Sequence, residues 1–445
     1  MTEFQKRWHA YEPEFLDDLK QLVAIDSVRD TDHAADGSPF GPQIARAFDC
    51  FLQIAEKCGL QTQNVQGYAC DARLGAQDHG YIGVLGHLDV VEAGDPAQWH
   101  TPPFTMTADE QGMLYGRGVN DDKGPLLAAL YAVRILRDME IPLQYGIRVI
   151  AGGAEETTWE CMRTYFSHEP QPLMGFSPDG NFPIVNGEKG IRKYDLLFAR
   201  ADAHPERPVL HHIACATLHN YVCDQICCQV DDAPSLCFTG QRTLSRNPQR
   251  GQNALFAFAQ HFRNLPLAQP EANACIAFLH DALSPDPYGQ ACGLYSSDPD
   301  MGTTSVCPTG LEEKEDGLHL YVDVRYPRSI TPAQLDKRFE QLGTEYGFAS
   351  TVEDEKRLLY VAPDHPLVRA LGQAYTQVTG EPVACFTKGG ASYARVLDCG
   401  IAFGATFPEE DTHPHMPNEC MALSSLSRAA EIYFEALCRL AGQGT

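Results

Sequence analysis

Two short apolar runs, separated by an amphipathic helix, constrain the fold of this chain more than any other feature. Residues 81–86 and 146–151 each have the length and apolar character of a buried strand. Between them, Pro125 suits the first turn of a helix, and Leu126 and Leu130 begin an apolar stripe on one helix face. Strand, helix and strand in this order predict an α/β layer with a largely parallel sheet. Ligands usually bind in the loops at the carboxyl ends of such strands.

The sequence on both sides of this core supplies further helices. Apolar stripes predict a helix over 11–25, a second helix over 43–58, and a closing helix that contains Leu426, Tyr433 and Leu440. These helices are long enough to cover the faces of the predicted sheet.

The pattern changes after Gly190 and returns at Pro363, which predicts an inserted domain. The intervening sequence mixes alternating strands, such as 318–324, with helices, such as 251–263. We therefore expect an α/β domain made of two separate stretches and an α+β domain between them: 1–189 and 361–445 for the first, and 190–360 for the second.

The composition narrows the range of partners. The chain has 59 acidic and 34 basic side chains among 445 residues, so its formal net charge is −25. Nucleic acid and anionic membrane surfaces both need a basic face, which argues against either as a partner. No apolar run approaches the roughly 18 residues of a membrane span, and residues 1–20 lack the apolar stretch of a secretory signal. We therefore expect a soluble cytoplasmic protein.

The sixteen cysteines are expected to be reduced thiols, because a chain without a secretory signal does not normally carry a disulfide framework. Cys223, Cys227 and Cys228 lie close together but lack the second C-x-x-C pair of a zinc site. We expect buried or surface thiols at these three positions.

Several widespread catalytic motifs are absent from the sequence. It contains no G-x-S-x-G, no G-x-x-x-x-G-K-[ST] and no H-E-x-x-H. Gly116 and Gly118 lack the third glycine of a dinucleotide-binding turn, because position 121 is Asp. What remains is a set of polar residues placed just after the predicted strands.

The first of these polar residues follow the strand over 81–86. In an extended chain, residues two apart point to the same side, so the Asp89 carboxylate can lie behind the His87 imidazole. A carboxylate in that place fixes the tautomer of a histidine that binds a metal. The alternative is a hydrogen-bonded loop histidine with no ligand role.

Two pairs of acidic residues follow. Asp121 and Asp122 lie at the entrance of the central helix, and Glu155 and Glu156 follow the strand over 146–151. Two carboxylates that point into one crevice repel each other unless a cation or a proton relieves them. The alternatives are an ordinary helix-capping Asp and a solvated pair of glutamates.

Three more residues complete the set. Asp179 lies in the turn of Ser-Pro-Asp-Gly, where an ordinary turn aspartate is the alternative, and His413 and His415 lie near the C-terminus. Taken together, two histidines, one aspartate that can bridge and several further carboxylates suit two zinc-type ions about 3.5–4 Å apart, sharing one carboxylate and one water.

These motifs resemble the co-catalytic zinc peptidases of the M20 type, particularly the PepV-like cytosolic dipeptidases. The resemblance covers nearly the whole chain and includes 22–28, 41–45, GHLDVV, GRGVNDDKG, AEET, SPDG and the C-terminal H-x-x-N-E. It implies a catalytic α/β domain with a mixed sheet flanked by helices, and an inserted α+β lid domain. It also implies a monomer or a homodimer that acts on small peptides.

The resemblance further implies a role for each residue of the set. Two Zn²⁺ ions, or Mn²⁺ or Co²⁺ in their place, would be held by five ligands: His87 and Asp179 on one ion, Glu156 and His415 on the other, and Asp121 between them. Asp89 would orient His87, and Glu155 would be the general base that takes a proton from the metal-bridging water. His415 is preferred over His413 because it stands three residues before Asn418.

The resemblance also assigns residues to the substrate. Asn220, within 218–222, matches a lid asparagine, and Arg325 matches an arginine that pairs with the C-terminal carboxylate of the peptide. Gly390 and Ser392 lie in a stretch that resembles a loop of backbone donors for the same carboxylate.

The sequence departs from the family at two lid positions. Leu244 stands where the family has a histidine that stabilises the oxyanion, and Cys223 stands where the family has a proline. Loss of one oxyanion donor commonly lowers kcat by about 10²–10³. Four nearby residues are candidates to replace the missing donor: Arg242, Ser245, Arg246 and His219.

The leading hypothesis is therefore a dinuclear zinc peptidase that cleaves dipeptides with free termini. A second hypothesis keeps the metal site but makes the protein an N-acyl amino acid deacylase or carboxypeptidase-like amidohydrolase. A third, motivated by Leu244, is a catalytically impaired relative that binds peptides.

Overall fold

The computed structural model describes residues 1–216, 219–284 and 286–443, and it divides the chain into two compact units. The first unit contains 1–186, 361–386 and the chain from Ser392 onward, and the second contains 187–360 and 387–391. The sequence placed the inserted domain at 190–360. Residues 387–391 are the main difference: they belong to the second unit, where the Gly389 carbonyl oxygen accepts a hydrogen bond from Arg325.

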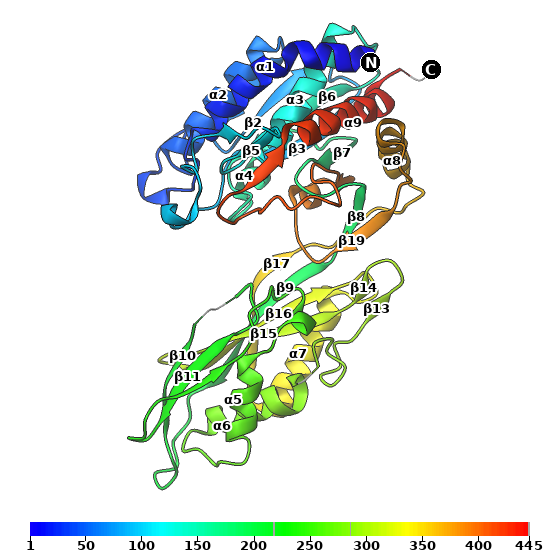
Figure 1. Cartoon of the computed structure of the whole chain (residues 1–445). Helices are drawn as coiled ribbons and strands as arrows, with labels where there is room; N and C mark the ends of the chain where they lie inside the picture. Colours follow the sequence, from blue (N-terminus) through cyan, green and yellow to red (C-terminus); the bar gives the residue numbers. More distant parts are fainter. Residues whose placement is uncertain (217–218, 285, 444–445) are drawn as a thin grey trace. The chain divides into compact units, whose positions relative to one another are not determined.

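A nine-stranded mixed sheet forms the centre of the first unit (Figure 1). Its strands, in spatial order, are β1 (Gln61–Val65), β2 (Ala69–Leu74), β6 (Gly146–Gly152), β3 (Tyr81–His87), β7 (Met174–Ser177), β20 (Gly400–Ala402), β8 (Ile184–Glu188) and β18 (Leu359–Tyr360), while β19 (Cys385–Lys388) also pairs with β8. Strands β8 and β19 each begin in the first unit and end in the second. Strand β18 belongs to the second unit and ends where the chain returns to the first.

The α/β fold and the mixed sheet that the family resemblance implies are confirmed, whereas the largely parallel sheet expected from the strand, helix and strand pattern is wrong. The pairs β6–β3, β3–β7 and β7–β20 are parallel, whereas β1–β2, β2–β6, β20–β8 and β8–β18 are antiparallel. Strands β1 and β2 are joined by a short turn, which permits only antiparallel pairing. The fully buried β3 and β6 are the two apolar runs that the sequence predicted.

Helices cover this sheet. Their bounds in the first unit are α1 (Glu3–Val23), α2 (Pro42–Lys57), α3 (Lys123–Asp138), α4 (Glu160–His168), α8 (Pro366–Thr379) and α9 (Leu423–Ala441). Helices α3 and α9 pack side by side over β3 and β6, and α1 contacts both (Figure 1). Helix α1 begins well before the predicted residue 11, because Thr2 and Gln5 form a capping box at its start.

A small antiparallel sheet completes the first unit. It contains β4 (Thr107–Ala108), β5 (Met113–Tyr115) and β21 (Cys420–Ala422). Strand β21 brings the C-terminal segment that contains Glu419 beside the loop at Gly116, whose N–H donates to the Glu419 carbonyl oxygen over 3.1 Å.

The second unit has the predicted α+β character. Its four-stranded antiparallel sheet has the order β15 (Ser305–Glu313), β16 (Gly317–Tyr326), β9 (Gly190–Ala199) and β17 (Ala349–Lys356). A second sheet contains β10 (Leu210–Cys215), β11 (Gln225–Val230) and β12 (Leu236–Thr239), and a short pair contains β13 (Ser297–Asp298) and β14 (Gly302–Thr303). Helices α5 (Ala254–Phe262), α6 (Pro270–Phe278) and α7 (Pro332–Tyr346) complete the unit, whose core includes Leu196, Phe258 and Phe339.

A disulfide in the second unit corrects the expectation of thiols throughout. Cys227 on β11 and Cys237 on β12 are bonded, and the other fourteen cysteines are free. The two residues lie directly opposite each other in an antiparallel pair, where side chains approach closely. Cysteine spacing does not predict this pairing, because it does not determine the register of two strands.

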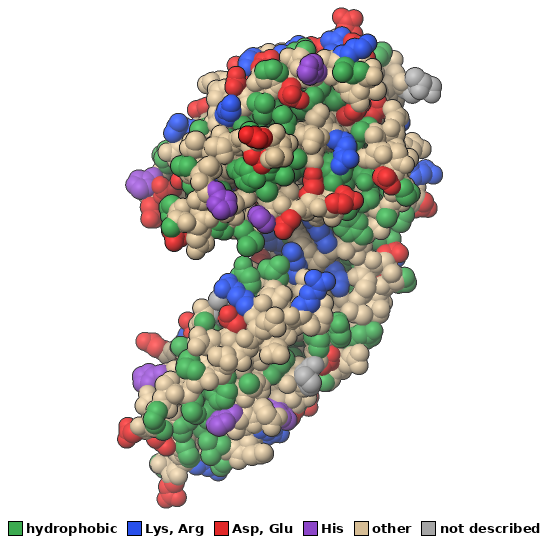
Figure 2. Space-filling view, viewed as in Figure 1, with side chains coloured by type: hydrophobic (Ala, Val, Ile, Leu, Met, Phe, Trp, Pro, Cys, Tyr) green, Lys and Arg blue, Asp and Glu red, His purple; other side chains and the backbone are tan. Residues whose placement is uncertain are grey.

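Acidic and basic side chains are interspersed on the face of the molecule in Figure 2, so the net negative charge is not gathered into one block there. Among the residues described, no helix is both long and apolar enough to cross a membrane.

Candidate metal centre

The predicted ligands gather where the central strands of the first unit end. His87 is the last residue of β3, Glu155 and Glu156 follow β6, and Asp179 follows β7. These three strands are parallel neighbours, so their carboxyl ends meet at one edge of the sheet. Asp121 arrives from the loop before α3.

Asp121 lies between two imidazoles. Its Oδ1 is 3.0 Å from His87 Nε2, and its Oδ2 is 3.0 Å from His415 Nε2. The same His415 nitrogen is 3.0 Å from Glu156 Oε1. Each oxygen of one carboxylate therefore faces a different histidine, which is the arrangement that a carboxylate bridging two cations requires.

The ligand atoms form two groups that share His87. His87, Asp121 and Glu156 form one group, and His87, Glu155 and Asp179 form the other, with the atoms of each group within 4.8 Å of one another. The structure thus brings together all the residues that the sequence proposed as ligands. It also places Glu155, expected to be a base, as near to His87 and Asp179 as a ligand would be.

The acidic side chains at this site shift the pKa values of both histidines upward. Hydrogen bonds to Asp121 and Glu156 raise the pKa of His415 to about 11. Burial would lower the pKa of His87, but its hydrogen bonds to Asp121 and Asp89 outweigh burial and raise it. Burial and the nearby Asp121 charge raise the pKa of Glu156 to about 7. Clustered carboxylates therefore need positive charge among them, and the nitrogen and oxygen donors present suit Zn²⁺, Mn²⁺ or Co²⁺ in that place.

Asp89 connects His87 to the turn that contains both glutamates. The His87 Nδ1 atom is 2.9 Å from the Asp89 carbonyl oxygen and 3.5 Å from its carboxylate. The two carboxylate oxygens accept hydrogen bonds from the backbone N–H groups of Glu155 and Glu156, each over 3.1 Å. Asp89 thus fixes both the imidazole and the start of the glutamate turn.

The buried Asp122 holds the other side of His87. Its Oδ2 accepts a hydrogen bond from the His87 backbone N–H over 3.2 Å. The preceding Gly86 has no room for a side chain, because a Cβ atom there would lie 2.2 Å from this oxygen. A substitution at Gly86 would therefore displace the strand end that presents His87.

Sequence reasoning missed the role of Glu419. This fully buried carboxylate accepts hydrogen bonds from the backbone N–H groups of Gly118, Asn120 and Asp121 over 3.0–3.1 Å, and from Arg117 Nη1 over 2.6 Å. It therefore fixes the loop that presents Asp121. Glu419 is the last residue of the motif H-x-x-N-E, but the motif indicated only which histidine is the ligand and assigned no role to this glutamate.

The structure brings His415, and not His413, to the cluster. The His413 Nε2 atom instead lies 3.3 Å from the Asp411 carboxylate. Asn418 accepts a hydrogen bond from the backbone N–H of His100 and so ties down the same loop.

The predicted substrate residues are divided between the units. Ser392 is buried in the first unit, next to Tyr393, whose ring lies edge-on to His87 at 6.0 Å. Asn220, Arg325 and Gly390 belong to the second unit.

Within the second unit, Arg325 is already held by its neighbours. Its guanidinium donates to both carboxylate oxygens of Asp323, over 2.8 and 2.7 Å, and to the Gly389 carbonyl over 2.9 Å. The Asp323 carboxylate also accepts from the Ser245 hydroxyl over 2.6 Å, and the Ser245 backbone N–H donates to the Asn220 carbonyl over 2.9 Å. One chain of hydrogen bonds therefore links Asn220 to Arg325.

The four candidates to replace the histidine at position 244 have different surroundings. The Ser245 hydroxyl is committed to Asp323, the Arg242 guanidinium stacks on Tyr221 and the His219 ring packs against Tyr321. Arg246 is exposed, and its charge interacts with those of Arg325 and Glu188. Its Nη1 lies 3.0 Å from the place that a Cβ atom would take on Gly390.

Comparison with known proteins supports these observations. The sequence pattern of peptidase family M20/M25/M40 matches residues 83–439. A protein from Staphylococcus haemolyticus, provisionally named a dipeptidase, is 32% identical over 474 residues, covering 99% of this chain and 100% of the relative.

Solved structures share the fold at lower identity. A dipeptidase from Saccharomyces cerevisiae is 15% identical with a TM-score of 0.62, covering 98% of this chain and 97% of its own. A metallo-carboxypeptidase from Sulfolobus solfataricus is 18% identical with a TM-score of 0.61, covering 95% of this chain and 98% of its own.

The contacts of Glu419 predict that Glu419→Gln weakens metal binding by about 10- to 100-fold, because the loop of Asp121 loses a charged anchor. Calorimetric titration of the metal-free protein with Zn²⁺ measures this change. The exposed Glu409 provides the control, and Glu409→Gln should bind as the wild type does. Unchanged affinity in Glu419→Gln would show that other contacts position Asp121.

Proposed function

This chain belongs to peptidase family M20/M25/M40, and we propose that it is a dipeptidase that uses two divalent metal ions to hydrolyse dipeptides with free termini. The observation that supports this most is the position of Asp121, whose two oxygens face His87 and His415 separately. The provisional name of the staphylococcal relative is consistent with dipeptides as substrates.

In this proposal, the metal ligands divide as the family resemblance implies. His87 and Asp179 would hold one ion, Glu156 and His415 would hold the other, and Asp121 would bridge them. Two bound cations would supply Lewis acidity, which acidifies water and polarises the scissile carbonyl. Zinc is the expected metal, and Mn²⁺ or Co²⁺ would also suit these donors.

Glu155 is proposed to move the proton. Its backbone N–H donates to Asp89, and its carbonyl accepts a hydrogen bond from Trp159 Nε1 over 2.6 Å, so its backbone is held from both sides. Its carboxylate reaches the ligand atoms of His87 and Asp179. We propose that it takes a proton from the attacking water and gives it to the leaving amine.

The second unit is proposed to act as the lid, with Asn220, Arg325 and Gly390 binding the substrate together with Ser392 of the first unit. An arginine next to backbone donors suits the C-terminal carboxylate of a peptide. Binding both ends of a short substrate would select dipeptides over long chains. We further propose a cytoplasmic location and leave open a monomer or a homodimer.

We propose that Arg246 takes over the role of the lid histidine, whose place in this chain is occupied by Leu244. Arg246 stands two residues after Leu244, it is exposed, and its guanidinium lies beside Gly390. A guanidinium offers five N–H donors and a permanent positive charge, which suit a developing oxyanion.

Metal removal tests the overall proposal. Chelated protein should lose hydrolysis of free dipeptides and regain it with Zn²⁺ or Mn²⁺, while N-acetylated dipeptides remain uncleaved. Release of amino acids, measured by chromatography, follows the reaction. Cleavage of the N-acetylated compounds alone would instead favour the deacylase hypothesis, and two bound metals without turnover would favour an impaired relative.

The role of Glu155 is tested by Glu155→Gln. If it is the base, this variant keeps both metals and loses about 10²- to 10⁴-fold in kcat. Metal content by atomic absorption is measured beside turnover. Loss of metal would mean that Glu155 is a ligand, as its position near His87 and Asp179 also permits. The exposed Glu110→Gln serves as a control with unchanged turnover and metal content.

The role of Arg246 is tested by Arg246→Ala, which should lower kcat by about 10²-fold with little change in metal content. Adding Leu244→His to this variant should restore part of the loss. Arg250→Ala, in the short 3-10 helix Pro248–Arg250 that follows, should leave kcat unchanged. Equal turnover in Arg246→Ala and the wild type would exclude Arg246 as the donor.

A further inference from the structure

The second sheet of the second unit holds a close pair of thiols as well as its disulfide. We propose that Cys215 and Cys223 are a reactive dithiol that low-molecular-weight disulfides oxidise reversibly to an intramolecular disulfide, and that this oxidation weakens substrate binding through Asn220. The first part of this inference is independent of the proposed function, whereas the effect on substrate binding rests on it.

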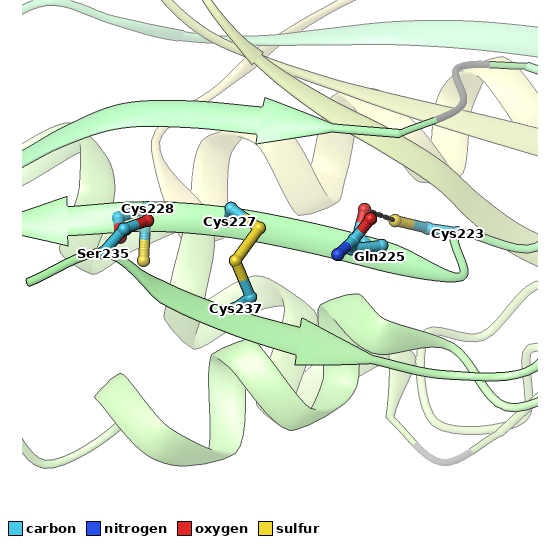
Figure 3. The surroundings of a disulfide bond; sticks show 6 residues. All are labelled: Cys223, Gln225, Cys227, Cys228, Ser235 and Cys237. Carbon is cyan, nitrogen blue, oxygen red and sulfur yellow. Dashed lines mark hydrogen bonds between the residues drawn. A yellow bond between two sulfur atoms is a disulfide. The ribbon is translucent and has the colours of Figure 1, made fainter.

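The two sulfur atoms are already in contact. Cys215 lies at the end of β10 and Cys223 just before β11, eight positions apart in the sequence, and their Sγ atoms are 3.7 Å apart. The Cys223 thiol also lies 3.4 Å from the Gln225 carbonyl oxygen, the contact drawn as a dashed line in Figure 3. A disulfide bond is about 2.05 Å long, so the sulfurs must approach by roughly 1.6 Å, which side-chain rotation can supply.

The hydrogen bonds distinguish the two thiols. The Cys215 sulfur accepts from the Cys223 thiol and from the Leu311 backbone N–H, the latter over 3.2 Å. Two donors on one sulfur favour its thiolate. The hydrogen bond from Cys223 lowers the pKa of Cys215, and the Leu311 N–H adds to this although burial opposes it. The same hydrogen bond, together with burial, raises the pKa of Cys223.

The different exposure of the two thiols indicates which of them reacts first with the small disulfide. Cys215 is half-buried and so can meet a small reagent, whereas Cys223 is fully buried. Cys215 is therefore the attacking thiol and Cys223 the resolving thiol. Among the neighbouring cysteines, Cys275 is also fully buried, and Cys227 is already bonded to Cys237 (Figure 3).

The chemistry balances without any group beyond the small disulfide. The Cys215 thiolate attacks one sulfur of R–S–S–R, the S–S bond breaks and R–S⁻ leaves. Cys223 then gives up its proton, and its thiolate attacks Cys215 Sγ and releases the second R–S⁻. Both released thiolates take up the protons lost by the two cysteines. Two protein thiols are thus oxidised while one small disulfide is reduced to two thiols.

Backbone hydrogen bonds link the segment that contains Cys223 to the segment 243–245, which contains Leu244. Asn220 lies between Cys215 and Cys223 in the sequence, and its carbonyl oxygen accepts from the Ser245 N–H over 2.9 Å. The Val222 N–H donates to the Thr243 carbonyl over 2.9 Å. If the new bond also shifts the Cys223 backbone, these contacts carry that shift to Asn220 and to the segment 243–245.

The test treats metal-loaded protein, in which Cys215 and Cys223 are thiols, with glutathione disulfide and maps its disulfides by mass spectrometry. Chymotrypsin cuts after Tyr221, so fragments that contain Cys215 and Cys223 stay joined only through a new disulfide. Wild type should give this linked pair. Cys223→Ser should instead accumulate glutathione on Cys215, and Cys215→Ser should leave Cys223 unmodified.

Control variants and activity complete the test. A double variant, Cys227→Ser with Cys237→Ser, should still form the Cys215–Cys223 link. Oxidised wild type should show a several-fold higher KM for dipeptides than reduced protein, with a smaller change in kcat, and Cys215→Ser should not respond.

Different results would overturn the dithiol and its effect on substrate binding. Absence of the link, or faster modification of other half-buried thiols such as Cys385 or Cys399, would overturn the dithiol. An unchanged KM in fully linked protein would overturn the effect on Asn220. Failure of the protein to cleave any dipeptide would overturn the proposed function while leaving the mass measurement decisive for the thiols.

Discussion

Repulsion among carboxylates at the ends of β3, β6 and β7 is the constraint on which the surrounding structure depends. Asp121 lies between two imidazoles, and burial raises the pKa of the neighbouring Glu156 to about 7. Such a cluster is stable only if its members are held from behind and positive charge lies between them. Asp89 and Glu419 supply the first condition through backbone N–H groups. Divalent cations would supply the second, because the nitrogen and oxygen donors present suit them.

The central part of the fold could be predicted from the sequence because its signals are local. The apolar runs of β3 and β6 and the stripe of α3 are each visible within a few residues. The local pattern did not predict the antiparallel strands at the edges of the sheet, which only the family resemblance implied, because strand direction depends on partners far apart in the chain. The start of α1 was missed for a different reason: the capping residue Thr2 precedes the apolar stripe that predicted the helix.

The residues of the metal site could be predicted from the sequence, but the residues that hold them in position could not. His87, Asp121 and the glutamates follow predicted strands or precede a predicted helix, so their gathering at one sheet edge follows from topology. The role of Glu419 did not follow, because its partners are backbone groups some 300 positions away, including the Asp121 N–H. Cross-strand pairing of Cys227 with Cys237 was hidden in the same way, since it depends on register.

The substitution at Leu244 is best understood through its neighbours in the second unit. Ser245 joins the Asn220 backbone to Asp323, and Asp323 holds Arg325, so the residues around position 244 form one connected group. An arginine in this group differs from the family histidine in one physical respect. An imidazole loses its charge near neutral pH, whereas a guanidinium keeps its charge throughout. If Arg246 supplies the oxyanion donor, this donor does not titrate in the working range, and the alkaline limit of activity is set by other groups.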